Sequence, residues 1–260
     1  MSTVNVSNVR KIYPGHAPQD EPVLALDDIS FEVGHHEFCS ILGHSGCGKT
    51  TLLNLLAGFE KPTRGAMTVD GEPVGDPCWQ RTVVFQDYAL FPWMTVAQNI
   101  GFGLEMRKVS RERQKAIVDR NIELVGLTGF EHRYPHQLSG GMKQRVSIAR
   151  ALAVDPNVLL MDEPFAALDA QNRAMMQREM GRILASSEPE HRKTMVLVTH
   201  SIEEAILLSD RIIVLTRRPG RVKADIEVDL PRPRCEDDPG FQSLKARLRD
   251  LIHDEFAVEH

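Results

Sequence analysis

The sequence predicts an α/β fold, in which a largely parallel sheet is covered by helices, with an inserted helical lobe and a small N-terminal antiparallel β region. Short apolar runs of strand character alternate with segments of helical periodicity, which is typical of βαβ units. From about residue 92 to residue 153 the pattern is helical alone, which indicates a lobe inserted into the sheet. Near the N-terminus apolar and polar residues alternate, as in an antiparallel strand with one buried face.

The N-terminal elements follow from this alternation. Residues 3–12 form an expected strand that ends at the turn Pro14-Gly15. The polar stretch His16–Pro22 is expected to be a loop, and Leu26–Val33 a second strand. Residues 66–85 are expected to form a strand, a turn and another strand.

The central elements are more apolar. Phe38–Leu42 is a short apolar run that predicts a buried strand, and the leucine-rich segment Thr51–Ala57 predicts a helix that Gly58 ends. Three later apolar runs predict further central strands: Val158–Met161, Met195–Val198 and Arg211–Thr216.

Domain boundaries are expected at changes in composition. Residues 1–230 are predicted to form one domain, with the helical lobe at about 87–153 inserted into it. Beyond Pro219 the chain is polar and rich in proline, and a final amphipathic helix is expected near Phe241–Phe256. Residues 231–260 are therefore predicted to be a C-terminal helical extension.

Composition limits the classes of function. The 260 residues carry a net charge of −5, which argues against a nucleic-acid partner, because such proteins present a basic surface. The four cysteines form no CxxC pair and are expected to be reduced thiols. We see no signal peptide, and no apolar run approaches the roughly 18–20 residues of a membrane span. A role at a membrane would therefore be that of a peripheral subunit.

The first motif that carries chemistry lies between the predicted buried strand and its helix. It matches G-x-x-x-x-G-K-[ST], whose glycines let consecutive backbone N–H groups face phosphate oxygens, whose lysine reaches the β/γ-phosphates and whose hydroxyl binds Mg²⁺. The alternative is an ordinary glycine turn, but the required strand and helix both flank it, which favours a P-loop NTPase core. The nucleotide-binding candidates are Gly43, His44, Ser45, Gly46, Cys47, Gly48, Lys49, Thr50 and Thr51.

Two acidic residues follow the predicted strand that begins at Val158. Asp162 stands where a carboxylate can coordinate Mg²⁺, and Glu163 where it can polarise a water for attack on the γ-phosphate. Taken alone, such a pair is more often a solvated turn. A P-loop in the same chain favours the catalytic interpretation.

A second candidate anion site precedes the predicted helix at Lys143–Leu152. Ser139 is a natural N-cap, and Gly140 and Gly141 expose backbone amides at a helix N-terminus. The alternative is an ordinary helix cap. Two phosphate sites in one chain make sense if the second serves the nucleotide of another molecule.

Along the chain the phosphate-loop motif is followed by Gln86 after a strand, the LSGGM motif, the LLMDEP motif, Ala167-Leu168-Asp169 and His200 after a strand. With these motifs in this order, residues 1 to about 220 resemble the ABC-transporter ATPase family. By that resemblance, Ser139–Gly141 contact the γ-phosphate held by a partner ATPase subunit, which is either an identical copy or a close paralogue. Gln86 links the Mg²⁺ and water site to membrane subunits, Asp169 acts across the dimer, and His200 holds the γ-phosphate and orients the attacking water. Tyr13 matches the aromatic residue that stacks on adenine. The catalytic candidates are Glu163, His200 and Gln86, and the Mg²⁺ candidates are Thr50, Gln86 and Asp162.

Two of these assignments have a simpler alternative, and one residue departs from the family's pattern. Tyr13 considered alone would be a packing residue, and His200 a histidine with a hydrogen bond at a strand end. Met142 stands where the family's usual signature has glutamine, which removes a polar side chain but keeps Ser139 and the glycine amides.

The segments Phe85–Ile100, Leu215–Val222 and Val228–Arg234 are similar to the nitrate/sulfonate/taurine importer branch. That branch implies an ATP-hydrolysing subunit at the cytoplasmic face of the inner membrane, polytopic permease subunits, an extracytoplasmic solute-binding protein and a small anionic solute. The competing class is an ABC-type ATPase without a transporter, such as an iron–sulfur-assembly ATPase. A DNA-repair cassette would need heptads that the insert lacks, and a P-loop kinase or GTPase would leave the Ser139 motif and His200 without a role.

Overall fold

The computed structural model describes residues 3–15, 20–166, 168–185 and 193–253. Residues 16–19 of the predicted loop, Ala167 and the end of the final helix at Phe256 lie outside these ranges. The chain divides into two compact units. The first unit comprises Met1–Pro77 and Lys193–His260, and the second unit comprises Cys78–Arg192.

The first unit contains the predicted antiparallel β region. Its strands β1 (Val4–Tyr13), β2 (Val23–Val33), β4 (Arg64–Val69) and β5 (Glu72–Pro73) lie in the order β2-β1-β4-β5. Val4 pairs with Val33 on one side and with Val69 on the other. The predicted turn at Asp70 and Gly71 joins β4 to β5, and both residues have positive φ, as tight two-residue hairpins require.

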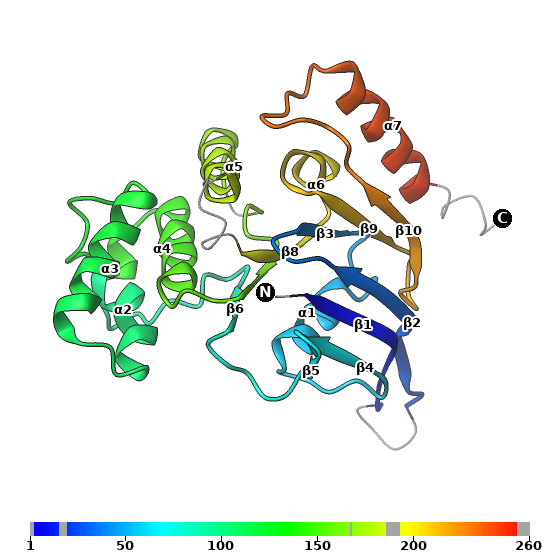
Figure 1. The fold of residues 1–260 in the computed structure, drawn as a ribbon, viewed down its shortest axis with the longest axis horizontal. Coiled ribbons are helices and arrows are strands. Elements are labelled where there is room, and N and C mark those ends of the chain that lie inside the picture. Colours follow the sequence, from blue (N-terminus) through cyan, green and yellow to red (C-terminus); the bar gives the residue numbers. More distant parts are fainter. Residues whose placement is uncertain (1–2, 16–19, 167, 186–192, 254–260) are drawn as a thin grey trace. The chain divides into compact units, whose positions relative to one another are not determined.

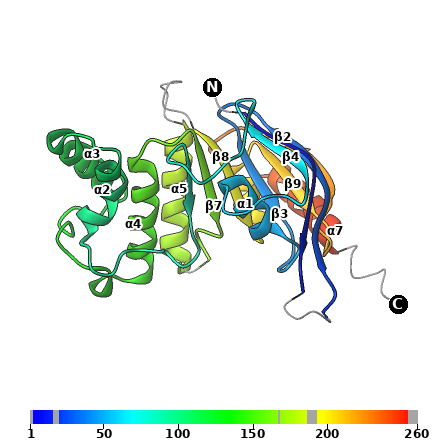
Figure 2. The same ribbon diagram turned by 90° about the horizontal axis from the view of Figure 1, so that it is seen from below.

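A parallel core fills the rest of the first unit. Strands β3 (Phe38–Leu42), β8 (Thr194–Thr199) and β9 (Arg211–Leu215) are parallel, with β3 in the middle, and every residue of β3 and β8 is buried. Helix α1 (Lys49–Ala57) lies between the two sheets, and α6 (Ile202–Leu208) lies on the other face of the parallel strands (Figure 1, Figure 2). The predicted central strands of this unit are confirmed.

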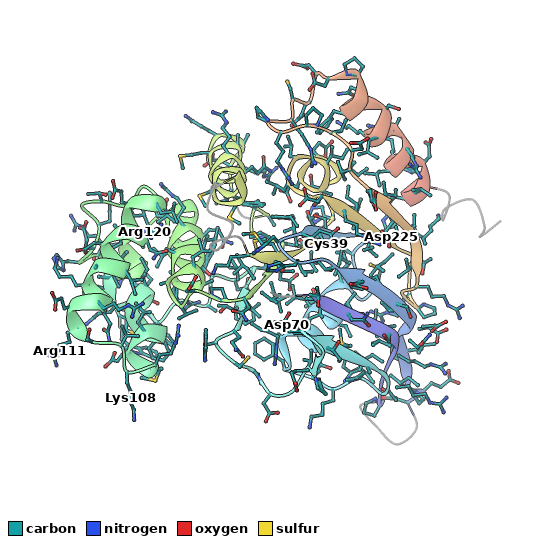
Figure 3. The ribbon with its side chains drawn as sticks, in the orientation of Figure 1. Cys39, Asp70, Lys108, Arg111, Arg120 and Asp225 are labelled. Carbon is teal, nitrogen blue, oxygen red and sulfur yellow. The ribbon has the colours of Figure 1, made fainter. Side chains whose placement is uncertain are left out.

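Two strands escaped prediction, the two-residue β5 and an edge strand of the other sheet. Strand β10 (Val222–Glu227) pairs antiparallel with β9 at the edge of the sheet. Among its residues only Ile226 is buried, and Asp225 forms an ion pair with Arg211 at 2.6 Å (Figure 3). An edge strand that is this polar carries no apolar run, so its sequence resembles a loop.

The C-terminal segment shares the core of the first unit. Helix α7 (Pro239–His253) packs against α6, and its Phe241 and Leu248 are fully buried against side chains of β3, α6, β9 and β10. Figure 1 shows α7 beside α6 and β10. The predicted boundary at residue 230 remains a prediction.

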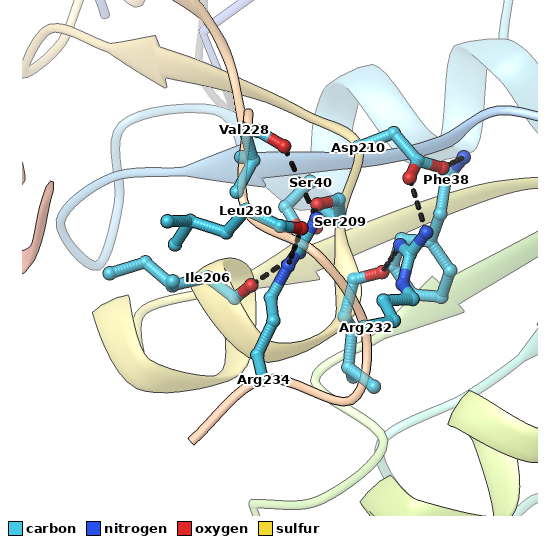
Figure 4. A network of polar contacts seen from close by, with 10 residues as sticks. Phe38, Ser40, Ile206, Ser209, Asp210, Val228, Leu230, Arg232 and Arg234 are labelled. Atoms are coloured by element: carbon cyan, nitrogen blue, oxygen red, sulfur yellow. Dashed lines mark hydrogen bonds and ion pairs between the residues drawn. The ribbon is translucent and has the colours of Figure 1, made fainter. Parts of the chain in front are cut away.

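The segment that leads into α7 is held by arginine side chains (Figure 4). The Arg234 guanidinium donates to the carbonyls of Ile206 at 2.6 Å and Leu230 at 3.0 Å. Arg232 pairs with Asp210, whose carboxylate also accepts from the Phe38 amide at 3.0 Å. Burial, with Arg232 nearby, lowers the pKa of Arg234 to about 10. These bonds tie the segment to the end of α6 and the start of β3.

Phe241→Ala tests whether α7 belongs to this core. Removing a fully buried ring leaves a cavity, so we expect the free energy of unfolding to fall by about 3–5 kcal/mol. Arg247→Ala on the exposed side of the same helix should change it by less than about 0.5 kcal/mol. Urea unfolding of both variants measures this, and equal midpoints would contradict a shared core.

The second unit contains the helical lobe. Its helices are α2 (Val96–Met106), α3 (Arg111–Leu124) and α4 (Gly140–Ala153), with a short 3₁₀ helix at Pro135–Gln137. Apolar residues of the three long helices form one core, as the spacing predicted, while Lys108 and Arg111 point outward (Figure 3).

The same unit holds two parallel strands and a further helix. Strands β6 (Arg81–Val84) and β7 (Val158–Asp162) pair in parallel, and α5 (Ala170–Ala185) follows β7. Within the described part of the chain, no helix has the length and apolar character needed to cross a membrane.

Candidate active site

The loop Gly43–Gly48 connects β3 to α1, as the motif predicted. Lys49 is the first residue of α1, and its ammonium group donates to the carbonyl oxygens of Gly43 and His44, both at 2.9 Å. The Lys49 side chain is 5% exposed. Its two hydrogen bonds therefore brace the loop, and its charged group is buried against the loop carbonyls.

Glycine is required at the last position of this loop. Gly48 is the N-cap of α1 with φ 103°, a conformation that L side chains rarely adopt. A Cβ at this position would lie 2.6 Å from Leu26 Cδ2 and 3.1 Å from the Ala25 carbonyl oxygen. Because Gly48 carries no side chain, β2 can approach the loop, and the N-cap of α1 makes no side-chain hydrogen bond to the first turn.

Two residues from distant segments, Arg218 and Ile252, support the loop, and neither was selected from the sequence. Arg218, between β9 and β10, donates from Nε to the Gly46 carbonyl at 3.2 Å. His44 Nε2 lies 3.2 Å from the Ile252 carbonyl near the end of α7. Both partners are about 170–210 residues away in sequence, so no local pattern could have identified them.

His200 follows β8 directly. Thr199 Oγ1 accepts from the Ser201 amide at 3.0 Å, and Ser201 caps α6 by accepting from the Glu204 amide at 3.2 Å. These bonds fix the backbone on both sides of His200, whose side chain is exposed. Since Leu42 pairs with Thr199, His200 leaves its strand at the same sheet edge as Gly43.

The acidic pair lies at the carboxyl end of β7 in the second unit. Asp162 is 8% exposed, whereas Glu163 is half-buried and has φ 45°. A non-glycine residue in this conformation costs about 1–3 kcal/mol and occurs preferentially at functional sites. The Glu163 carbonyl accepts from the Ala166 amide at 3.1 Å, which closes the turn that aims the side chain.

Asp169 directly precedes α5. It is exposed, and its carbonyl accepts from the Arg173 amide at 2.8 Å. The Arg173 guanidinium donates back to the carbonyls of Phe165 at 3.3 Å and Leu168 at 3.1 Å. The loop that carries Asp169 is thus braced by its own helix.

Gln86 follows β6 and is exposed. Because Val84 pairs with Met161, Gln86 leaves the strand pair at the same edge as Asp162 and Glu163. Tyr88 and Ala89, which come next, both have positive φ.

Arg150 of α4 holds the loop that follows Gln86. Its guanidinium donates to the carbonyls of Ala89 at 2.7 Å and Tyr88 at 3.1 Å. Burial lowers the pKa of Arg150. Sequence reasoning missed this residue because it lies more than 60 positions from its partners.

Ser139 caps α4, as expected. Its hydroxyl accepts from the Met142 amide at 3.3 Å, which leaves the amides of the helix's first turn at an exposed N-terminus. A Cβ on Gly140 would lie 3.1 Å from the Tyr88 hydroxyl. The Met142 side chain packs against the apolar core of the lobe. A methionine in place of the family's usual glutamine therefore suits its surroundings.

The site residues therefore fall into two groups. Tyr13, the loop Gly43–Thr51 and His200 belong to the first unit, and the others to the second. Within the described residues, no three His, Cys, Asp or Glu side chains gather as a metal cluster. The predicted Mg²⁺ ligands Thr50, Gln86 and Asp162 all offer oxygen atoms, which are the donors that Mg²⁺ prefers when phosphates supply the remaining ligands.

A lysine-braced phosphate loop after β3 and a strained glutamate after β7 define a nucleotide-hydrolysing cassette. The family model for ABC transporters matches residues 26–166, and the chain belongs to this family. It binds ATP, and the predicted activity, ATP hydrolysis coupled to transport, is confirmed at this level.

Individual relatives refine this assignment. The chain is 47% identical to an uncharacterized ABC transporter ATP-binding protein of Methanocaldococcus jannaschii, over 97% of this chain and 92% of that protein. It is 42% identical to the nitrate import ATP-binding protein NrtD of Synechococcus elongatus, over 91% and 87% of the two chains. The predicted resemblance to the nitrate importer branch is therefore confirmed.

A third relative is longer. The chain is 46% identical to the bicarbonate transport ATP-binding protein CmpC of Synechococcus elongatus, and the match covers 98% of this chain but 39% of CmpC. Among solved structures, the dimeric ATP-binding cassette MJ0796 bound to ADP and Pi superposes with a TM-score of 0.77. It is 31% identical over 88% of this chain and 100% of that one. The predicted fold class is confirmed.

Proposed function

We propose that two copies of this ATPase subunit, or one copy and a close paralogue, bind two Mg·ATP molecules between them and use their hydrolysis to drive import of a small anion. Each ATP lies between the P-loop of one subunit and the Ser139 motif of the other. The observation that carries the proposal is that one chain holds two helix N-termini next to glycines, α1 after Gly48 and α4, which begins at Gly140 after Ser139. A solved relative, MJ0796, is dimeric.

Within each site the roles follow from chemistry. Lys49 and the loop amides hold the β- and γ-phosphates. Glu163 accepts a hydrogen bond and then a proton from the attacking water. His200 orients that water and holds the γ-phosphate. Asp162, Gln86 and Thr50 hold Mg²⁺, which neutralises charge on the phosphates when bound. Tyr13 stacks on the adenine, and Asp169 contacts the partner subunit.

The segment after Gln86 supports a membrane partner. Trp93 is 69% exposed, and its ring lies 5.7 Å from that of Phe91. An exposed tryptophan beside a half-buried phenylalanine is typical of an interaction surface. We propose that a helix of the permease subunits binds this surface. This subunit then lies peripherally at the cytoplasmic face of the inner membrane.

The solute class is inferred from relatives. The two named importers, NrtD and CmpC, carry nitrate and bicarbonate in their names, and both solutes are small anions. A small anion delivered by an extracytoplasmic binding protein is therefore the proposed cargo. A mixed dimer of Lys49→Ala and Ser139→Arg subunits tests the shared site, because each variant damages a different half of it.

A further inference from the structure

A polar network links the end of β1 to the helix of the phosphate loop. Tyr13 Oη lies 3.0 Å from Glu60 Oε1 and 3.3 Å from Thr51 Oγ1. An ionised carboxylate can only accept hydrogen bonds, so the phenol donates its proton to Glu60. Thr51 is in α1 and Glu60 follows its C-cap, Gly58, so both ends of α1 take part.

Lys11 completes the network from the same strand as Tyr13. Its Nζ lies over the Tyr13 ring, 4.9 Å from the ring centroid. Nζ also lies 2.8 Å from Glu60 Oε2 and donates to the Lys61 carbonyl at 3.0 Å. A cation therefore lies over one face of the Tyr13 ring, and a stacked planar group would have to take the opposite face.

The pKa values of Glu60 and Tyr13 agree with this arrangement of donor and acceptor. Burial favours the neutral form of Glu60, but hydrogen bonds from Lys11 and Tyr13 outweigh it and leave the pKa of Glu60 below its usual value. Burial raises the pKa of the Tyr13 phenol, which stays protonated and able to donate. The Lys11 side chain is 13% exposed and that of Glu60 27%, so solvent screens this ion pair only in part.

We propose that Glu60, with Lys11, is a positioning residue that holds the Tyr13 ring at one angle, with the face opposite Lys11 directed toward the nucleobase. This rests on the proposed contact between Tyr13 and adenine. The network anchors the ring to α1, the helix whose first turn also faces the phosphates, so base and phosphates are located by one rigid element. Glu60 therefore determines affinity for the adenosine half of the nucleotide and has no effect on the phosphate half.

Two ligands separate this role from a purely structural link between β1 and α1. Mg·ADP contains the base, whereas Mg·pyrophosphate engages the phosphate loop alone, and neither is hydrolysed during titration. For the full chain we expect Glu60→Gln and Tyr13→Phe each to weaken ADP about threefold to tenfold, with pyrophosphate within about twofold of wild type. Glutamine keeps an acceptor oxygen but loses the charge, so Glu60→Gln weakens the hydrogen bond that Tyr13→Phe removes. The double variant should therefore be no weaker than the more affected of the two single variants.

The controls make each outcome decisive. Glu72→Gln on exposed β5 should change neither affinity. Unchanged ADP affinity in Glu60→Gln, or equal weakening of ADP and pyrophosphate, would overturn the positioning role.

Tyr13→Ala reports on the proposed base contact itself. If it leaves the ratio of ADP to pyrophosphate affinity unchanged, the base contact fails and this inference with it, whereas a changed ratio beside a silent Glu60→Gln refutes this inference alone.

Discussion

Glu163→Gln should lower steady-state ATP hydrolysis by about 10²–10³-fold, or roughly 3–4 kcal/mol in the barrier. Glutamine keeps the size and the strained backbone position at φ 45° but cannot take a proton from the attacking water. The phosphate loop belongs to the other unit of the chain and is untouched. We therefore expect Mg·ATP affinity within about threefold of wild type, and an ATP-bound dimer that accumulates because turnover no longer dissolves it.

Phosphate release measures the turnover, and size-exclusion chromatography with and without ATP measures the dimer. Glu105→Gln, which changes an exposed residue of the helical lobe, is the matched control and should behave as wild type. A Glu163→Gln rate within about twofold of wild type, only ~0.4 kcal/mol in barrier, would remove Glu163 from the catalytic role.

Lys49→Ala should lower both ATP affinity and turnover strongly. The lysine supplies the cation for the β/γ-phosphates, and it also braces the loop through two 2.9 Å bonds to Gly43 and His44. Charge-assisted bonds of this kind are worth about 1.5–3 kcal/mol each, so we expect ATP affinity to fall at least about tenfold to a hundredfold.

Thermal unfolding with increasing ATP measures this loss, because a ligand raises stability in proportion to the logarithm of its concentration over its Kd. The variant's ATP-dependent rise in Tm should shift to higher ATP concentration, while the exposed Lys61→Ala follows the wild-type curve. A Lys49→Ala curve that overlays wild type would show that the phosphates bind elsewhere.

Local patterns were sufficient to predict the parts of this molecule that depend on neighbouring residues. The β3–loop–α1 unit needed only an apolar run, glycines and a leucine-rich helix, and the structure has it at the expected residues. The Ser139 cap is likewise a local feature, since its acceptor and donor are three residues apart.

The sequence could not reveal contacts that join distant segments. Glu60 lies 47 residues from Tyr13, and Arg150 lies 61 residues from Ala89, so periodicity carries no signal for either pair. Strand β10 was missed because pairing at a sheet edge, and not an apolar run, defines it. The strained backbone at Glu163 is invisible in sequence, because any residue type can be forced there by its surroundings.

The central claim is that the Ser139 motif of one subunit completes the P-loop site of another, and ATP hydrolysis by a verified mixed dimer tests it most directly. Lys49→Ala damages the P-loop alone. Ser139→Arg places bulk and charge at the N-terminus of α4 and leaves its own P-loop intact. In a mixed dimer one shared site receives both defects and the other receives neither, whereas both sites are damaged in either homodimer.

Two differently tagged variants, co-purified through both tags and assayed with the permease subunits present, supply that mixed dimer. We expect the mixed dimer to regain Mg·ATP binding at one site per dimer and measurable hydrolysis, while each homodimer stays inactive. A mixed dimer that recovers neither binding nor hydrolysis would show that the Ser139 motif serves the nucleotide of its own chain, and would contradict the shared site.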